Sequence, residues 1–176
     1  MYENRDYTEM LKRKQQQCVI SPLIAWEFIQ FQKETKDNHW LKDFFSLKNL
    51  SFNNNWLINL PHIKNILKLG NKAVVVTDLK QRFVYASQFF EEMTGFSRES
   101  VMGKTPKLFQ GPATDPEELK RLGMLISTNQ PASAVVDNYK KDGTLYKCKI
   151  DITPIHDKNE KVVSYMAIEE EYFDNV

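Results

Sequence analysis

The chain is poor in the residues that support small disulfide-bonded or metal-bound folds. It has two cysteines and three histidines in 176 residues. Cys18 and Cys148 lie far apart, without the spacing of a zinc or redox motif. The six glycines form no phosphate-binding loop. A chain of this length buries enough apolar surface to fold unaided. We therefore expect no metal site and no disulfide framework.

Long apolar runs and an excess of one charge are also missing. The longest apolar runs are four residues, as in Ala73–Val76, whereas a membrane span needs about 20. The N-terminus is charged and has no signal-peptide core. With 24 Lys and Arg against 23 Asp and Glu, the net charge is +1, which argues against a broad phosphate-binding face. We expect a cytoplasmic protein without a membrane or nucleic-acid partner.

Residues 1–70 have helical rather than strand periodicity. Ser21 followed by Pro22 is a typical helix start. A second helix is expected over 39–47, followed by a turn-rich break at 51–55, and a third before Gly70. This helical extension packs on its own domain or serves as a dimerisation or signalling arm.

Residues 72–172 alternate between strand and helix patterns. The expected strands are 72–77, 82–86, 132–140, 145–153 and 161–172, and the expected helices are 87–94, 97–103 and 115–127. Asp142-Gly143 marks a tight hairpin, and Asp115-Pro116 is a clear helix start. The order predicts an α+β fold: a five-stranded antiparallel sheet with short helices on one face.

Several motifs in this half, in order, resemble a PAS domain. The matching segments are 73–78, 83–87, 90–97, 101–104, 140–144 and 152–155. The resemblance covers about 100 of the 176 residues and implies a PAS domain over 71–173, preceded by the helical extension of residues 1–70. Fold resemblance alone does not identify a ligand.

The segment GKTPKLFQGPATD at 103–115 is similar to the segment Gly-Arg-Asn-Cys-Arg-Phe-Leu-Gln-Gly-Pro-x-Thr-Asp of LOV domains, the flavin-based blue-light sensors of the PAS family. Pro106 stands where that subgroup has the cysteine that bonds to the flavin. Lys107 replaces a phosphate-binding arginine and loses its bidentate fork. The resemblance therefore implies a LOV-like domain without the photoactive cysteine, so that photoadduct chemistry is not expected.

The same resemblance supplies a candidate pocket. Its residues are Thr105, Gln110, Asn138, Cys148 and Glu169. Only the glutamine and the asparagine keep the LOV side chain, and Glu169 replaces a glutamine that contacts the flavin ring. If Glu169 faces the core, we expect a raised pKa or a partner such as Lys107 or Tyr139. Large side chains could instead fill the cavity; the candidates are Phe89, Phe90, Phe96, Phe109 and Met166.

On these grounds we expect no cofactor, with flavin as the alternative. Haem is disfavoured because the long helix at 115–127 and the loop before it contain no histidine. No catalytic motif is present, and adjacent glutamates such as Glu91-Glu92 are typical of solvated helix faces. We therefore expect a non-enzyme.

The chain ends soon after the last expected strand, which favours a stand-alone sensory or signalling module acting through protein–protein interaction or ligand-biased conformational change. The alternative is a small-molecule sensor with a ligand, such as flavin, in the core cavity. We expect a homodimer formed through the N-terminal helices and the sheet face, and a signalling partner that the sequence does not identify.

Overall fold

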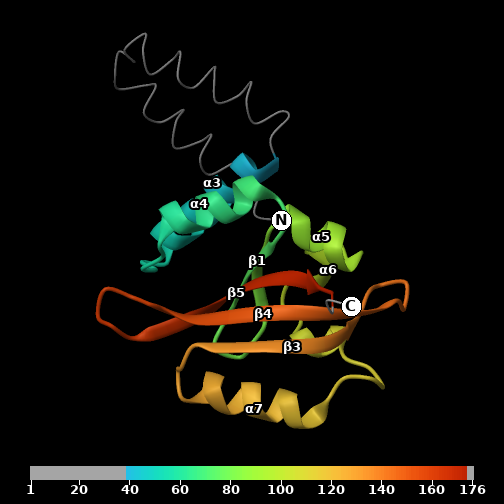
Figure 1. Cartoon of the computed structure of the whole chain (residues 1–176). Coiled ribbons are helices and arrows are strands. Elements are labelled where there is room, and N and C mark those ends of the chain that lie inside the picture. Colours follow the sequence, from blue (N-terminus) through green and yellow to red (C-terminus); the bar gives the residue numbers. More distant parts are fainter. Residues whose placement is uncertain (1–38, 174–176) are drawn as a thin grey trace, which may run out of the picture. The chain divides into compact units, whose positions relative to one another are not determined.

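The structure is a computed structural model that describes residues 39–173. Cys18 and the helix expected after Ser21 lie outside the described residues. Figure 1 shows the elements in chain order: α3 His39–Asn53, α4 Leu60–Leu69, β1 Ala73–Thr77, β2 Phe83–Ala86, α5 Gln88–Thr94, α6 Arg98–Val101, the 3-10 helix η1 Pro106–Phe109, α7 Pro116–Ser127, β3 Ala132–Tyr139, β4 Leu145–His156 and β5 Val162–Tyr172.

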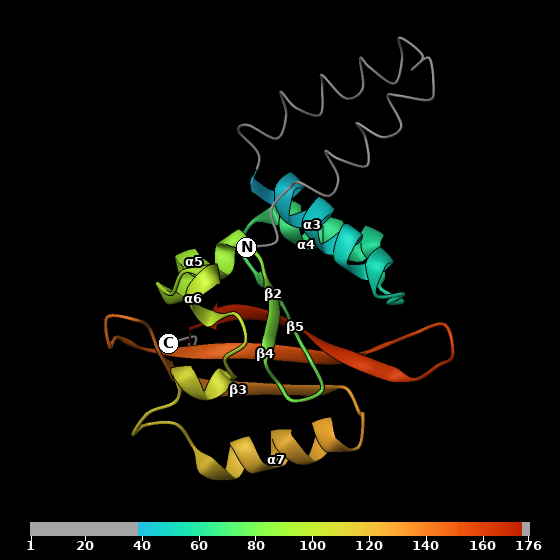
Figure 2. The same cartoon turned by 180° about the vertical axis from the view of Figure 1, so that it is seen from behind.

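The five strands form one antiparallel sheet in the order β2-β1-β5-β4-β3. The first and last strands of the chain therefore meet at the centre of the sheet. Figures 1 and 2 show α7 on one side of the sheet and the α3–α4 pair on the other. The predicted α+β architecture, with a helical segment before the sheet, is confirmed.

The two faces of the sheet carry separate apolar cores. On the inner face, the rings of Phe83, Phe90 and Phe109 lie with their centroids 5.7–5.9 Å apart. On the outer face, a second cluster joins α3 and α4 to the sheet; its buried members are Leu47, Ile63, Ile66, Leu67, Val74, Val76, Tyr85, Ile155 and Met166. Alternation along each strand produces this division, because successive side chains point to opposite faces.

A buried carboxylate also holds α3 in place. Asp43, only 3% exposed, accepts a 2.7 Å hydrogen bond from the backbone N–H of Gln88, the first residue of α5. Arg98 on α6 donates to the same carboxylate, and the Tyr85 hydroxyl donates to the Asp43 carbonyl at 3.0 Å. Burial raises the pKa of Asp43, while the Gln88 N–H and Arg98 oppose that rise.

The predicted boundaries are wrong in two places. The helix expected to end at Leu47 continues to Asn53, because Leu50 also packs into the outer cluster and the Ser51 hydroxyl donates back to the Lys48 carbonyl. The strand expected to end at residue 153 continues to His156, because Ile155 is buried against the outer cluster. Gly70 ends α4 as predicted, with a positive φ of 68°.

Candidate functional site

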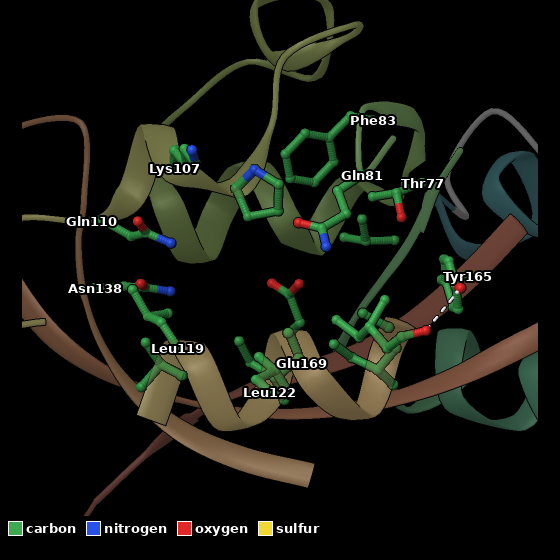
Figure 3. Close-up of a pocket in the computed structure, with 18 residues that line it drawn as sticks. Thr77, Gln81, Phe83, Lys107, Gln110, Leu119, Leu122, Asn138, Tyr165 and Glu169 are labelled. Carbon is green, nitrogen blue, oxygen red and sulfur yellow. Dashed lines mark hydrogen bonds between the residues drawn. The ribbon is translucent and has the colours of Figure 1, made fainter. Parts of the chain in front are cut away.

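A cavity of about 240 Å³ lies between the inner face of the sheet, η1 and α7. Its walls are mainly apolar, and polar side chains enter from several elements (Figure 3). The lining residues are Val75, Thr77, Gln81, Phe83, Pro106, Lys107, Gln110, Leu119, Leu122, Gly123, Ile126, Val136, Asn138, Ile150, Ile152, Tyr165, Ala167 and Glu169. An apolar cavity with a few convergent polar groups is the usual form of a small-molecule site.

The structure brings together three of the five candidate pocket residues. Gln110, Asn138 and Glu169 line the cavity, and the amides of the first two lie near each other in Figure 3. Thr105 is the residue before η1 and is not among the lining residues. Cys148 is fully buried in the aromatic core and does not line the cavity either.

The large side chains that could have filled the cavity lie elsewhere. Phe90, Phe96 and Phe109 pack together in the inner core, and none of them lines the cavity. Met166 lies in the outer cluster. Phe89 packs against the inner core and does not line the cavity either, so none of the five side chains fills it.

Loop 110–115 is held against β3 and so positions Gln110. The Thr114 hydroxyl donates to the Asp137 carbonyl at 2.6 Å and accepts from the Gly111 N–H at 3.0 Å. The Tyr139 hydroxyl accepts from the Ala113 N–H at 3.1 Å. A Cβ at Gly111 would lie 2.4 Å from the Tyr139 ring, so only glycine permits this approach.

Glu169 is the one acidic residue among the described residues that line the cavity. Its side chain points from β5 into the cavity (Figure 3), and burial raises its pKa to about 7. The raised pKa agrees with the expectation for a core-facing glutamate. Of the two suggested partners, Lys107 lines the same cavity, whereas Tyr139 contacts the loop instead.

Burial also governs the neighbouring titratable groups on β4. It raises the pKa of the Cys148 thiol and of the Tyr146 hydroxyl, and the nearby Glu169 adds to both shifts. Both groups are therefore held in their neutral forms, and the thiol lacks the lowered pKa of a reactive cysteine.

Most of the lining residues were not among the five predicted pocket residues; those missed include two on β5 and three near β1. Tyr165 and Ala167 precede Glu169 by four and two residues, so the period of two in a strand could have identified them. Tyr165 also ties β5 to the end of α7 by donating to the Ile126 carbonyl and the Asn129 side chain. Val75 and Thr77 are likewise two residues apart on β1, whereas Gln81 lies between β1 and β2 and no pattern signalled it.

Within residues 39–173, no group of three or more metal-ligating side chains comes together. No described helix is long and apolar enough to cross a membrane.

Comparisons with known proteins give a consistent result. A PAS domain model matches residues 71–171. The chain is 32% identical over 101 residues to a blue-light photoreceptor of Listeria monocytogenes, covering 56% of this chain and 40% of that protein. It is 30% identical over 100 residues to blue-light-activated histidine kinase 2 of Erythrobacter litoralis, which covers 55% of this chain and 29% of that protein. The match thus spans less than half of these relatives.

Solved structures agree with the curated relatives. The LOV domain of the Erythrobacter litoralis EL346 blue-light-activated histidine kinase superimposes with a TM-score of 0.54 and 29% identity, covering 56% of this chain and 94% of that one. A structure from a study of a flavin analogue in the light-oxygen-voltage domain mechanism superimposes with a TM-score of 0.59 and 26% sequence identity. The match covers 64% of this chain and 86% of that one.

These neighbours contradict the expectation of no cofactor, because they are LOV domains and LOV domains bind flavin as a chromophore. The changed contacts on which that expectation rested, such as Pro106 and Glu169, do not close the cavity. The matched region of the histidine kinases is their sensory part. With its family match over residues 71–171, its sheet and its LOV-domain relatives, the chain belongs to the PAS domain family.

Proposed function

We propose that this chain is a flavin-binding sensory domain of the LOV type, with the flavin ring in the cavity between η1, α7 and the inner face of the sheet. The observation that carries the proposal is the convergence of Gln110, Asn138 and Glu169 on one otherwise apolar cavity. The comparisons support this reading better than that of an interaction module with a closed core.

The cavity suits the chemistry of a flavin ring. One side of the ring is a methylated hydrocarbon, which matches walls such as Leu122, Ile150 and Val136. The opposite edge carries carbonyl and N–H groups, which match the amides of Gln110 and Asn138. Bound flavin supplies absorption of blue light and redox activity. Lys107 is a cation that a phosphate tail could pair with.

The proposed sensor works without a bond between flavin and cysteine. Pro106 lines the cavity and has no nucleophile. Cys148 does not line the cavity, and its buried thiol has a raised pKa. We infer that this domain belongs to a LOV-like subgroup in which the protein responds to its ligand through hydrogen bonds and packing alone.

The output and the assembly extend this proposal. A homodimer through the N-terminal helices and the sheet face remains our proposal, as do a signalling partner and a place in the cytoplasm. In support, Val135 on β3 and Tyr172 on β5 are partly exposed apolar residues. Light scattering of the full chain over a range of concentrations tests the dimer, and a constant monomer mass contradicts it.

Flavin binding is tested with the purified full chain. We expect a yellow protein that releases flavin on denaturation, or a colourless one that quenches the fluorescence of added flavin mononucleotide. Ala167→Leu narrows the cavity and should weaken binding, whereas Val135→Leu on an exposed position of β3 should not. A chain that neither contains nor binds flavin contradicts the proposed function.

A further inference from the structure

Three consecutive glutamates on β5 have different surroundings. Glu170 lies 2.9 Å from Lys72 and 3.4 Å from Lys149, and Glu171 lies 3.0 Å from Lys140. Within residues 39–173, no ion pair or hydrogen bond is formed by the carboxyl group of Glu169. Two of the three glutamates are thus neutralised by protein cations, and the third is not.

Strand geometry explains the difference. Glu169 pairs in register with Ala73 on β1 and Ile150 on β4, so its neighbours in the sheet are apolar. Its side chain enters the cavity from the central strand of the sheet (Figure 3), among mainly apolar lining residues. A carboxylate in such a place is costly unless it is paired.

We propose that Glu169 is the ligand-reading acid of the cavity: in its protonated form it donates a hydrogen bond to a ring carbonyl of the bound flavin, so that flavin binding is coupled to proton uptake at Glu169. This inference rests on the proposed function and adds the regulation of the same site by pH. When the carboxyl group starts ionised, one proton is taken up from solvent for each flavin bound.

No other charged residue that lines the cavity in the described part of the chain forms an ion pair with Glu169. Lys107 on η1 is the other charged lining residue in the described part of the chain; it is exposed and makes no ion pair with Glu169. The residues that α7 contributes are uncharged, and so are those of β1 and β3. On β4, Tyr146 and Cys148 stay neutral because burial raises their pKa values.

Protonated Glu169 adds a hydrogen-bond donor to those of the Gln110 and Asn138 amides in the same cavity. A carboxylic acid is a donor through its hydroxyl, whereas a carboxylate only accepts. Ionised Glu169 would repel the carbonyl oxygens of a flavin ring. Because burial raises its pKa to about 7, the free protein changes from the binding form to the repelling form close to neutral pH.

The test uses riboflavin, which has no phosphate group of its own to titrate, and measures its dissociation constant by fluorescence quenching at pH 6, 7 and 8. If only the protonated form binds, about one tenth of the protein is competent at pH 8, so binding should be roughly tenfold weaker than at pH 6. Glu169→Gln, which is neutral and still a donor, should bind with the same affinity at all three values. Glu170→Gln should keep the wild-type dependence.

Two results overturn the inference and leave the proposed function intact: wild-type binding that does not vary with pH, or a variation that persists in Glu169→Gln. A protein that binds no riboflavin or flavin mononucleotide at any pH instead overturns the proposed function, and the inference with it. A second readout needs no ligand. NMR titration of the Glu169 carboxyl carbon should show a midpoint near 7, and a midpoint at its ordinary value of 4.5 contradicts the inference.

Discussion

Asp43 on α3 and Arg98 on α6 form an ion pair, with 3.0 Å between the carboxylate Oδ1 and the guanidinium Nη1. The two residues are 55 positions apart in sequence. The carboxylate is almost completely buried, and the arginine is about one third exposed. The pair therefore joins the helix before the sheet to the short helices on its inner side.

We predict that Asp43→Ala lowers the free energy of unfolding by about 2–3 kcal/mol, because it leaves the Gln88 N–H without its acceptor and Arg98 without its main partner. Urea unfolding measures the change. Lys120→Ala removes one member of the exposed pair between Lys120 and Glu117 and should cost less than about 0.5 kcal/mol. Equal effects of the two substitutions would show that the buried pair contributes nothing special.

The packing of α3 on the sheet gives a second prediction. Leu47 is completely buried in the outer cluster, so Leu47→Ala should cost about 2–5 kcal/mol of unfolding free energy through lost contacts and a residual cavity. Leu69→Ala is the matched control, because that leucine is 74% exposed at the end of α4, and its stability should stay within about 0.5 kcal/mol of wild type. A small effect at Leu47 would mean that α3 does not pack on the sheet in solution.

The raised pKa of Glu169 predicts how stability depends on pH in the ligand-free protein. The unfolded chain ionises this group near 4.5, and the folded protein near 7. Between these values the folded state binds more protons, so the free energy of unfolding falls as the pH rises through this window. Thermal melts should show Glu169→Gln more stable than wild type at pH 8, by up to about 3 kcal/mol, and little different at pH 5. A constant difference across this range would contradict the prediction.

Two glycines near the cavity should respond oppositely to alanine. Gly111→Ala places a Cβ 2.4 Å from the Tyr139 ring, so we expect a loss of about 1–3 kcal/mol as the ring is displaced. Gly123→Ala meets nothing within 4 Å and lies inside α7, so we expect a gain of roughly 0.5–1 kcal/mol from helix propensity. Chemical denaturation of both variants checks the pair, and a neutral Gly111→Ala would show that loop 110–115 is not held against Tyr139.

Local patterns predicted the sheet well. The strands expected at 132–140 and 145–153 correspond to β3 and β4, and the Asp115-Pro116 start identified α7. The end of α3 was missed, because Ser51 and Asn53 have turn-like propensities that tertiary packing overrides. Propensity is a local quantity, and contacts with β1 and β5 are not.

The site was predicted in part for a similar reason. Gln110, Asn138 and Glu169 were found through motif resemblance, and the structure places all three at the cavity. Cys148 was included by the same resemblance, but it lies deeper, among the rings of the inner core. Whether a strand residue borders a void or fills it depends on the volumes of its neighbours, which a single sequence position does not reveal.

Along β5, residues that line the cavity alternate with residues that pack against α3 and α4. Ala167 and Glu169 face the cavity, while Met166 and Ile168 belong to the cluster beneath α3 and α4. Only the backbone of β5 therefore separates the cavity from the outer cluster at this point, and both sets of side chains are attached to it. If that strand tilts or slides, the cavity lining and the surface on which α3 and α4 pack move together. A change in the cavity is thereby coupled to the packing of these helices.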